Sequence, residues 1–282
     1  AEDREQLELD ATLQRIVDEA PGRVFLLDLH TTSGPGSAFA ILDDTLPNRE
    51  IALDYPVPLV LGLEEELAGT LASYMTGHGV TVLGFEAGQH EDPGSVERAA
   101  AAVWIALESC GLLTGPDRQR AVEARRLLSE QTASDVGIVE ILYRYEIDSG
   151  NGFYMEPGFE SFQKIEQGQV LARNGQAEVV APQSGMLVMP LYQDQGEDGF
   201  FLARQVRPFW LPVSAKLRGW HLEKYLHWLP GVSPDPDRPD TFLVDRRLAR
   251  FSALHLFHLL GFRREGKDGR ILTMTRRPDL ES

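Results

Sequence analysis

The sequence has a single cysteine, Cys110, in 282 residues. One cysteine excludes a disulfide within the chain, and its place in an apolar helical pattern favours a small buried hydrophobe over a nucleophile. This cysteine usage is typical of a reducing compartment, so we expect a cytoplasmic protein.

Long apolar runs and basic residues are also scarce. The longest apolar runs, such as residues 57–63, are too short to cross a bilayer. Lys and Arg number 27 against 43 Asp and Glu, a formal charge of −16. Such a chain is a poor partner for the phosphate backbone of nucleic acid. The 43% hydrophobic content is enough for one large or two modest cores. The sequence therefore predicts a globular protein that binds neither membranes nor nucleic acid.

Two polar side chains follow an apolar run near the N-terminus. Residues 24–28 predict a strand buried on both faces, and Asp28 and His30 lie at its end, before a turn rich in Thr, Ser, Gly and Pro. In open α/β sheets ligands bind at this edge. An imidazole there can bind a metal or move a proton, and a carboxylate two residues earlier can orient it. The alternative is a buried histidine without further role.

A second strand, residues 79–85, delivers Glu86 to a turn that ends at His90. Burial at the end of an apolar strand should raise the pKa of Glu86, as a general base at neutral pH requires. The alternative is a carboxylate that caps the next helix. His90 either lines the mouth of a pocket or is a surface residue.

Three segments resemble one known family in the same order. Residues 28–32, Asp-Leu-His-Thr-Thr, resemble the Asp-Leu-His segment of the succinylglutamate desuccinylase/aspartoacylase family, in the zinc carboxypeptidase superfamily. Residues 80–89 resemble the strand that carries its catalytic glutamate, and residues 181–186 and 198–201 resemble its β-rich domain. The resemblance covers roughly residues 1 to 205.

The resemblance implies a zinc-dependent hydrolase or deacylase that cleaves an amide or ester bond of a small acylated substrate. His30 would be a zinc ligand, and Glu86 the general base that deprotonates the metal-bound water. Four further residues would support this site or line the substrate pocket: Asp28, Thr31, Thr32 and His90.

The departures from the family pattern concern the metal and the substrate. No His-x-x-Glu pair, which supplies the other two zinc ligands in the family, occurs in the sequence. The chain opens on Ala1 without Met, and we expect that an N-terminal segment with this pair is missing. The competing expectation is a non-catalytic binding or interaction protein that kept the fold and lost the metal site. Phe200 stands near the place of a family tyrosine, so the substrate is expected to differ.

The predicted fold class is α/β, with a zinc-carboxypeptidase-like mixed sheet flanked by helices. We expect three parts: an N-terminally incomplete zinc-hydrolase-like domain at 1–136, a small β-rich domain at 137–205, and an α+β C-terminal extension at 206–282. The patterns predict helices over residues 3–19, from Glu64 to Tyr74, 95–112, 117–130 and 243–260, and a strand over 271–275.

Several smaller patterns remain. Asp43 and Asp44 are a candidate metal pair, but a turn is favoured. His255 and His258 have metal-ligand spacing on the helix predicted for 243–260, yet a core or surface place is favoured. Aromatic and basic residues of the C-terminal part suggest a contact surface for a partner or a second subunit, as in a homo-oligomer: Trp210, Trp220, Trp228, Arg207, Arg218, Arg246, Arg247 and Arg250.

Overall fold

The computed structural model describes residues 2–67, 69–132, 135–147, 152–249, 256–265 and 270–279. Within these ranges, no helix combines the length and the apolar character that a membrane span needs.

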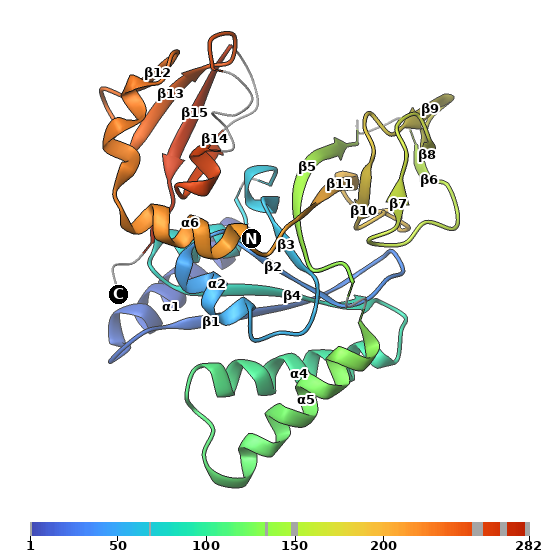
Figure 1. Ribbon diagram of the computed structural model, residues 1–282. Coiled ribbons are helices and arrows are strands. Elements are labelled where there is room, and N and C mark those ends of the chain that lie inside the picture. The colour runs from blue at the N-terminus through green and yellow to red at the C-terminus, as the bar shows by residue number, and fades with distance from the viewer. Residues whose placement is uncertain are drawn as a thin grey trace.

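An eight-stranded mixed sheet forms the centre of the fold (Figure 1), which confirms the predicted fold class. Its strand order is β1-β4-β2-β3-β5-β11-β10-β7. The bounds are β1 Phe25–Thr32, β2 Phe39–Leu42, β3 Leu59–Leu61, β4 Thr81–Gln89, β5 Ile138–Glu146, β7 Lys164–Ile165, β10 Gly185–Val188 and β11 Asp198–Val206. β1 and β4 are parallel neighbours, whereas β2 runs antiparallel to β4.

Helices cover both faces of the β1 and β4 half of the sheet. On one face, α4 (Gly94–Ser109) and α5 (Arg118–Gln131) pack against Leu83, Phe85 and Ala87 of β4. On the other face, α1 (Glu2–Glu19) and α3 (Leu71–Gly77) pack against Val82. Side chains alternate along a strand, so Glu86 belongs to the face of α1 and α3.

β1 is the outermost strand of the sheet, and the prediction that it is buried on both faces is wrong. Its side chains are half-buried or exposed as far as Thr31, and only Thr32 is buried. An edge strand has a sheet neighbour on one side only, which leaves the end of this strand open to solvent.

The β-rich part is built onto the same sheet. Strands β5, β11, β10 and β7 continue it with antiparallel pairings, and a three-stranded sheet of β6 (Phe153–Met155), β8 (Val170–Asn174) and β9 (Ala177–Val180) lies beside them. A separate apolar cluster, which includes Leu171, Leu187 and Phe200, joins the two sheets.

The C-terminal part forms a unit with its own core. It holds α6 (Trp210–Gly219), the 3-10 helix η3 (Leu222–Trp228) and a four-stranded antiparallel sheet of β12 (Val232–Pro234), β13 (Thr241–Asp245), β15 (Ile271–Arg276) and β14 (Phe262–Glu265). The strand predicted for 271–275 is confirmed. The helix predicted for 243–260 is wrong at its start, because 241–245 pair with β15, and of this range only 256–259 are helical among the described residues.

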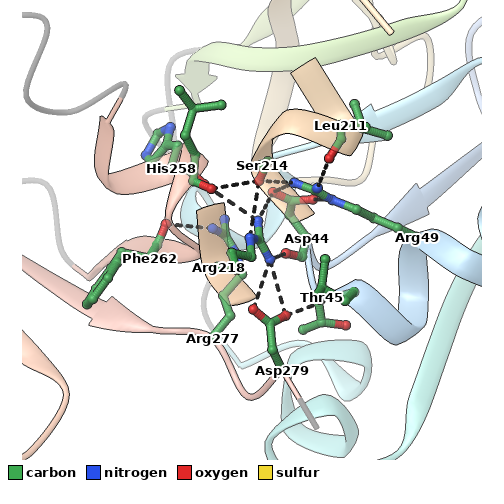
Figure 2. Close-up of polar contacts among 12 residues, drawn as sticks. Asp44, Thr45, Arg49, Leu211, Ser214, Arg218, His258, Phe262, Arg277 and Asp279 are labelled. Atoms are coloured by element: carbon green, nitrogen blue, oxygen red, sulfur yellow. Dashed lines mark hydrogen bonds and ion pairs between the residues drawn. The ribbon is translucent and has the colours of Figure 1, made fainter. Parts of the chain in front are cut away.

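Buried ion pairs join this unit to the large sheet. Asp44 accepts hydrogen bonds from Arg49 of α2 (Leu46–Ala52) and from Arg218 of α6, and Arg218 also binds Asp279 (Figure 2). We call these four residues the ionic cluster. Asp44 is therefore an ion-pair partner of two arginines, and its pKa is lowered because they outweigh the effect of burial.

A second set of ion pairs lies beside the ionic cluster. The helix predicted from Glu64 to Tyr74 is divided into a 3-10 turn, η1 (Leu63–Glu65), and α3. Glu64 and Glu65 both accept from Arg277, and Glu66 pairs with Arg264. The acidic triplet is thus a docking point for the C-terminal unit.

Other predictions had mixed outcomes. The helices expected over 3–19, 95–112 and 117–130 are present as α1, α4 and α5 within a few residues. Cys110 follows the end of α4 and is exposed, so the prediction that it is buried is wrong. A second 3-10 turn, η2 (Gly115–Asp117), precedes α5. His255 lies outside the described residues.

Candidate functional site

Adjacent parallel strands bring Asp28, His30 and Glu86 to one face of the sheet. His30 of β1 is in register with Glu86 of β4, and Asp28 is in register with Gly84. Residues two apart on a strand point the same way, so these side chains form a row beyond the packing of α1 and α3. Gly84 contributes no side chain to this row, which leaves space beside Asp28.

The imidazole of His30 is held by its neighbour two residues back. Its Nε2 lies 2.8 Å from Oδ1 of Asp28, and the two side chains are 57% and 31% exposed. When Nε2 donates to the carboxylate, Nδ1 of the neutral ring carries the lone pair. In the part of the chain that the structure describes, Nδ1 has no hydrogen-bond partner. It is therefore available to a proton or a ligand.

Glu86 is the buried member of the row. Its residue is 6% exposed, and Phe39 of β2 pairs with it on the side away from His30. Phe39 in turn packs edge-on against Phe162, at 5.3 Å between ring centroids. Burial in this surrounding raises the pKa of Glu86 to about 7, with His30 opposing the shift and Asp28 adding to it.

One carboxylate oxygen of Glu86 is unpaired. Oε2 is buried and has no hydrogen-bond partner. Buried polar atoms are satisfied in most proteins, and an exception is typical of a site that a water, an ion or a substrate completes. Glu86 thus combines a proton affinity suited to neutral pH with a free acceptor.

The same residues do not make a complete zinc site. Across the described ranges, no group of three or more His, Cys, Asp or Glu side chains is arranged to bind a metal ion. Structural and catalytic zinc sites need at least three protein ligands. His30 is the only imidazole in the row, so the described residues by themselves do not fit the metal that the family resemblance implies.

The structure places Thr31, Thr32 and His90 in a second group. They line a cavity of about 210 Å³ that lies against the 189–198 segment of the β-rich part. Nδ1 of His90 lies 2.7 Å from Oγ1 of Thr31, and Nε2 lies 3.1 Å from Oε1 of Gln193. Asp28, His30 and Glu86 are not among the residues that line this cavity.

Gln193 and Phe39 are site residues that the sequence did not indicate. Each comes next to the predicted residues only through tertiary contact, Gln193 across 103 residues and Phe39 through an antiparallel pairing. The run of Gln, Asp, Gly and Glu at 193–198 is the feature of the sequence that could have pointed to Gln193.

Comparison with known proteins finds similarity at the level of structure. No protein-family model matches the sequence, and no curated protein does. Among solved structures, succinylglutamate desuccinylase/aspartoacylase from Rhodobacter sphaeroides matches with a TM-score of 0.48 and 13% identity, over 68% of this chain and 62% of that one. This is the family that the sequence motifs resemble.

Other solved structures match to a similar extent. The apo ectoine utilization protein EutE (DoeB) from Ruegeria pomeroyi has a TM-score of 0.44 and 17% identity, over 64% of this chain and 59% of that one. Succinylglutamate desuccinylase from Vibrio cholerae has a TM-score of 0.45 and 16% identity, over 71% and 59%. The chain spans about three fifths of the length of the solved structures it matches.

Proposed function

We propose that the chain is a hydrolase that cleaves an acyl bond, an amide or an ester, in a small acylated compound, with Glu86 as the general base. The observation that carries the proposal is the free, buried Oε2 of Glu86 beside His30. A carboxylate with a pKa near 7 is matched to proton transfer at neutral pH.

The chemistry assigned to Glu86 is two proton transfers. Glu86 takes a proton from a water as the water oxygen bonds to the carbonyl carbon of the substrate. When the tetrahedral intermediate collapses, the bond to the leaving nitrogen or oxygen breaks, and Glu86 returns the proton to that atom. His30 lies on the adjacent strand and is oriented by Asp28, so in this proposal its imidazole lies beside the water and the carbonyl group of the substrate.

The cavity beside Thr31, Thr32 and His90 is the part of the site that we assign to the body of the substrate. Hydroxyl groups, the imidazole of His90, the amide of Gln193 and the carboxylates of Glu197 and Asp198 are polar groups of its lining, and Leu191 and Phe201 are apolar parts of it. Its volume of about 210 Å³ is below the usual range for drug-sized ligands, which fits a small acylated compound.

Activity on a panel of N-acyl amino acids and acyl esters tests the proposal. Glu86→Gln removes the base and keeps the shape, so kcat should fall at least about 100-fold on any substrate that the protein cleaves. Glu91→Gln removes an exposed carboxylate nearby and should leave kcat unchanged. A Glu86→Gln protein with full kcat would refute the role of Glu86.

Zinc is a separate proposal, which rests on the lone pair of His30 Nδ1 and on the resemblance of the 28–32 motif. A bound zinc ion would acidify a water. Its other ligands would have to come from outside the donors that the described residues bring together. Elemental analysis of the purified protein and of His30→Ala tests it: about one zinc per wild-type chain and much less in the variant are expected.

The second candidate function is a non-catalytic binding protein. The incomplete donor set around His30 favours it. A protein of this kind would bind members of the same panel without cleaving them, and Glu86→Gln would leave their affinity unchanged. Cleavage of any panel member in a Glu86-dependent manner would exclude this candidate.

A further inference from the structure

A second cavity lies away from Glu86, between the large sheet and the C-terminal unit. Its volume is about 420 Å³, within the range of small-molecule sites. Its lining comes from β3, β5, β11, α2, α6 and the 258–259 segment, and no residue is shared with the cavity beside His90. Asp44 and Arg49 of the ionic cluster belong to this lining, and Arg49 also donates to the carbonyl oxygen of Leu211 at 3.2 Å (Figure 2).

The acidic groups of this cavity are already paired. Two carboxylates, Asp44 and Glu140, line it, and each already accepts from two cationic groups. Glu140 binds Arg204, with 2.7 Å between Nη2 and Oε2, and His258, with 3.0 Å between Nδ1 and Oε1. The carboxylates therefore have little capacity left for a cationic ligand.

The cationic groups, in contrast, have donors to spare. Arg207 lines the cavity, and its guanidinium has no hydrogen bond or ion pair to any residue that the structure describes. Arg204 uses Nε and Nη2 for Glu140, which leaves Nη1 without a described partner. Although the chain has a formal charge of −16, the charged groups with unused hydrogen-bonding capacity in this cavity are therefore cationic.

Much of the remaining lining is apolar. Leu61, Val206, Leu211 and Leu259 line the cavity, and the ring of Trp210, which is 43% exposed, lies at its edge. Apolar side chains around a few directed donors are typical of sites for small organic molecules.

We propose that this cavity binds a small organic acid, whose carboxylate pairs with Arg207 and Arg204 and whose apolar tail packs against Trp210 and the leucines. Two free donor groups match the two oxygens of a carboxylate, since arginine forks bind carboxylates well. The ligand would touch both the large sheet and the C-terminal unit, so its binding stabilises their contact.

Isothermal titration of the full chain with 4-phenylbutyrate tests the proposal. This probe has a carboxylate on an apolar tail, and 4-phenylbutanamide is its neutral counterpart. We expect saturable binding of the acid with a dissociation constant below about 1 mM, and an affinity at least about tenfold lower for the amide. Equal binding of acid and amide, or no binding of the acid, would overturn it.

Two variants locate the site. Arg207→Gln removes the unpaired guanidinium and should lower the affinity for the acid at least about tenfold. Arg207 is exposed, so we expect this variant to fold. Arg246→Gln removes an equal charge from an exposed place on the same unit, outside the cavity, and should leave the affinity unchanged. If both variants weaken binding equally, the attraction is diffuse and the proposed site is wrong.

Discussion

Neutralising Asp44 should detach the C-terminal unit from the large sheet at lower denaturant than in the wild type. The Asp44→Asn change keeps the shape of the side chain and removes the charge that faces two guanidinium groups. Those groups belong to Arg49 and Arg218, whose side chains are 9% and 1% exposed. They cannot regain the lost interaction from water without opening the contact.

The magnitude follows from the partners that remain. Breaking a buried ion pair by removing one partner costs about 3–5 kcal/mol. Arg218 keeps Asp279 at 3.1 Å, so the lower part of the range, about 3 kcal/mol, is expected. The control is Asp117→Asn, which breaks an exposed pair with Arg120 and should cost less than about 1 kcal/mol.

Urea unfolding followed by two signals separates the C-terminal unit from the rest. Three of the four tryptophans, Trp210, Trp220 and Trp228, lie in the C-terminal part, whereas Trp104 lies in α4. Tryptophan fluorescence therefore reports mainly on that unit, and far-ultraviolet circular dichroism reports on the whole chain. In Asp44→Asn the fluorescence transition should move to lower urea and precede the dichroism transition.

A shift no larger than that of Asp117→Asn would refute the reasoning. It would mean that the ionic cluster contributes no more than a surface pair, because the cost of burying the charges cancels their attraction. Coincident transitions with a large shift would mean that the unit and the sheet unfold together.

Three further outcomes are expected. Burial raises the pKa of Glu86 to about 7 from an ordinary 4.5. The carboxyl therefore favours the folded state fully below pH 4.5 and loses this contribution as the pH rises through 7. In thermal unfolding, Glu86→Gln should be similar in stability to the wild type at pH 4 and more stable at pH 8, by up to about 3 kcal/mol. For His258, Glu65 and Glu140 outweigh burial and raise the pKa to about 9, so its contribution is complete below pH 6.5 and is lost as the pH rises through 9. The stability difference between the wild type and His258→Gln should shrink over that interval, and a difference independent of pH would contradict the assignment. Gly84→Ala should keep the fold, since its Cβ would meet Ile41 at an ordinary 3.5 Å, and an unfolded protein in circular dichroism would contradict this packing.

The sequence predicted local elements well and their partners poorly. The apolar and turn patterns were enough to place α1, α4, α5 and β4 within a few residues. They could not show that β1 is an edge strand, because its neighbours are set by pairings distant in the sequence. The segment before 250 has helical periodicity, but pairing of 241–245 with β15 prevails over that local preference.

The candidate site shows the same limit. The motifs indicated His30 and Glu86 as candidate site residues, and the structure places them in register on neighbouring strands. The sequence offered no sign that Arg218 is buried in the ionic cluster, where Asp44 and Asp279 supply its charge partners. Arg218 was expected on a contact surface, as an arginine among aromatic residues; the part of that expectation that concerns a partner or second subunit stays a prediction.

The ionic cluster can be completed only late in the synthesis of the chain. Asp44 meets Arg218 across 174 residues, and the N–H of Leu46 donates to Asp279 across 233 residues. A ribosome that adds 5–20 residues per second needs roughly 10–50 s for the longer of these intervals. Until Arg218 is added, Asp44 and Arg49 have only each other as ion-pair partners, and the part of the sheet that Leu211 of α6 later contacts is uncovered. The nascent chain thus depends on Asp279 to complete a contact that begins with Asp44 and Arg49.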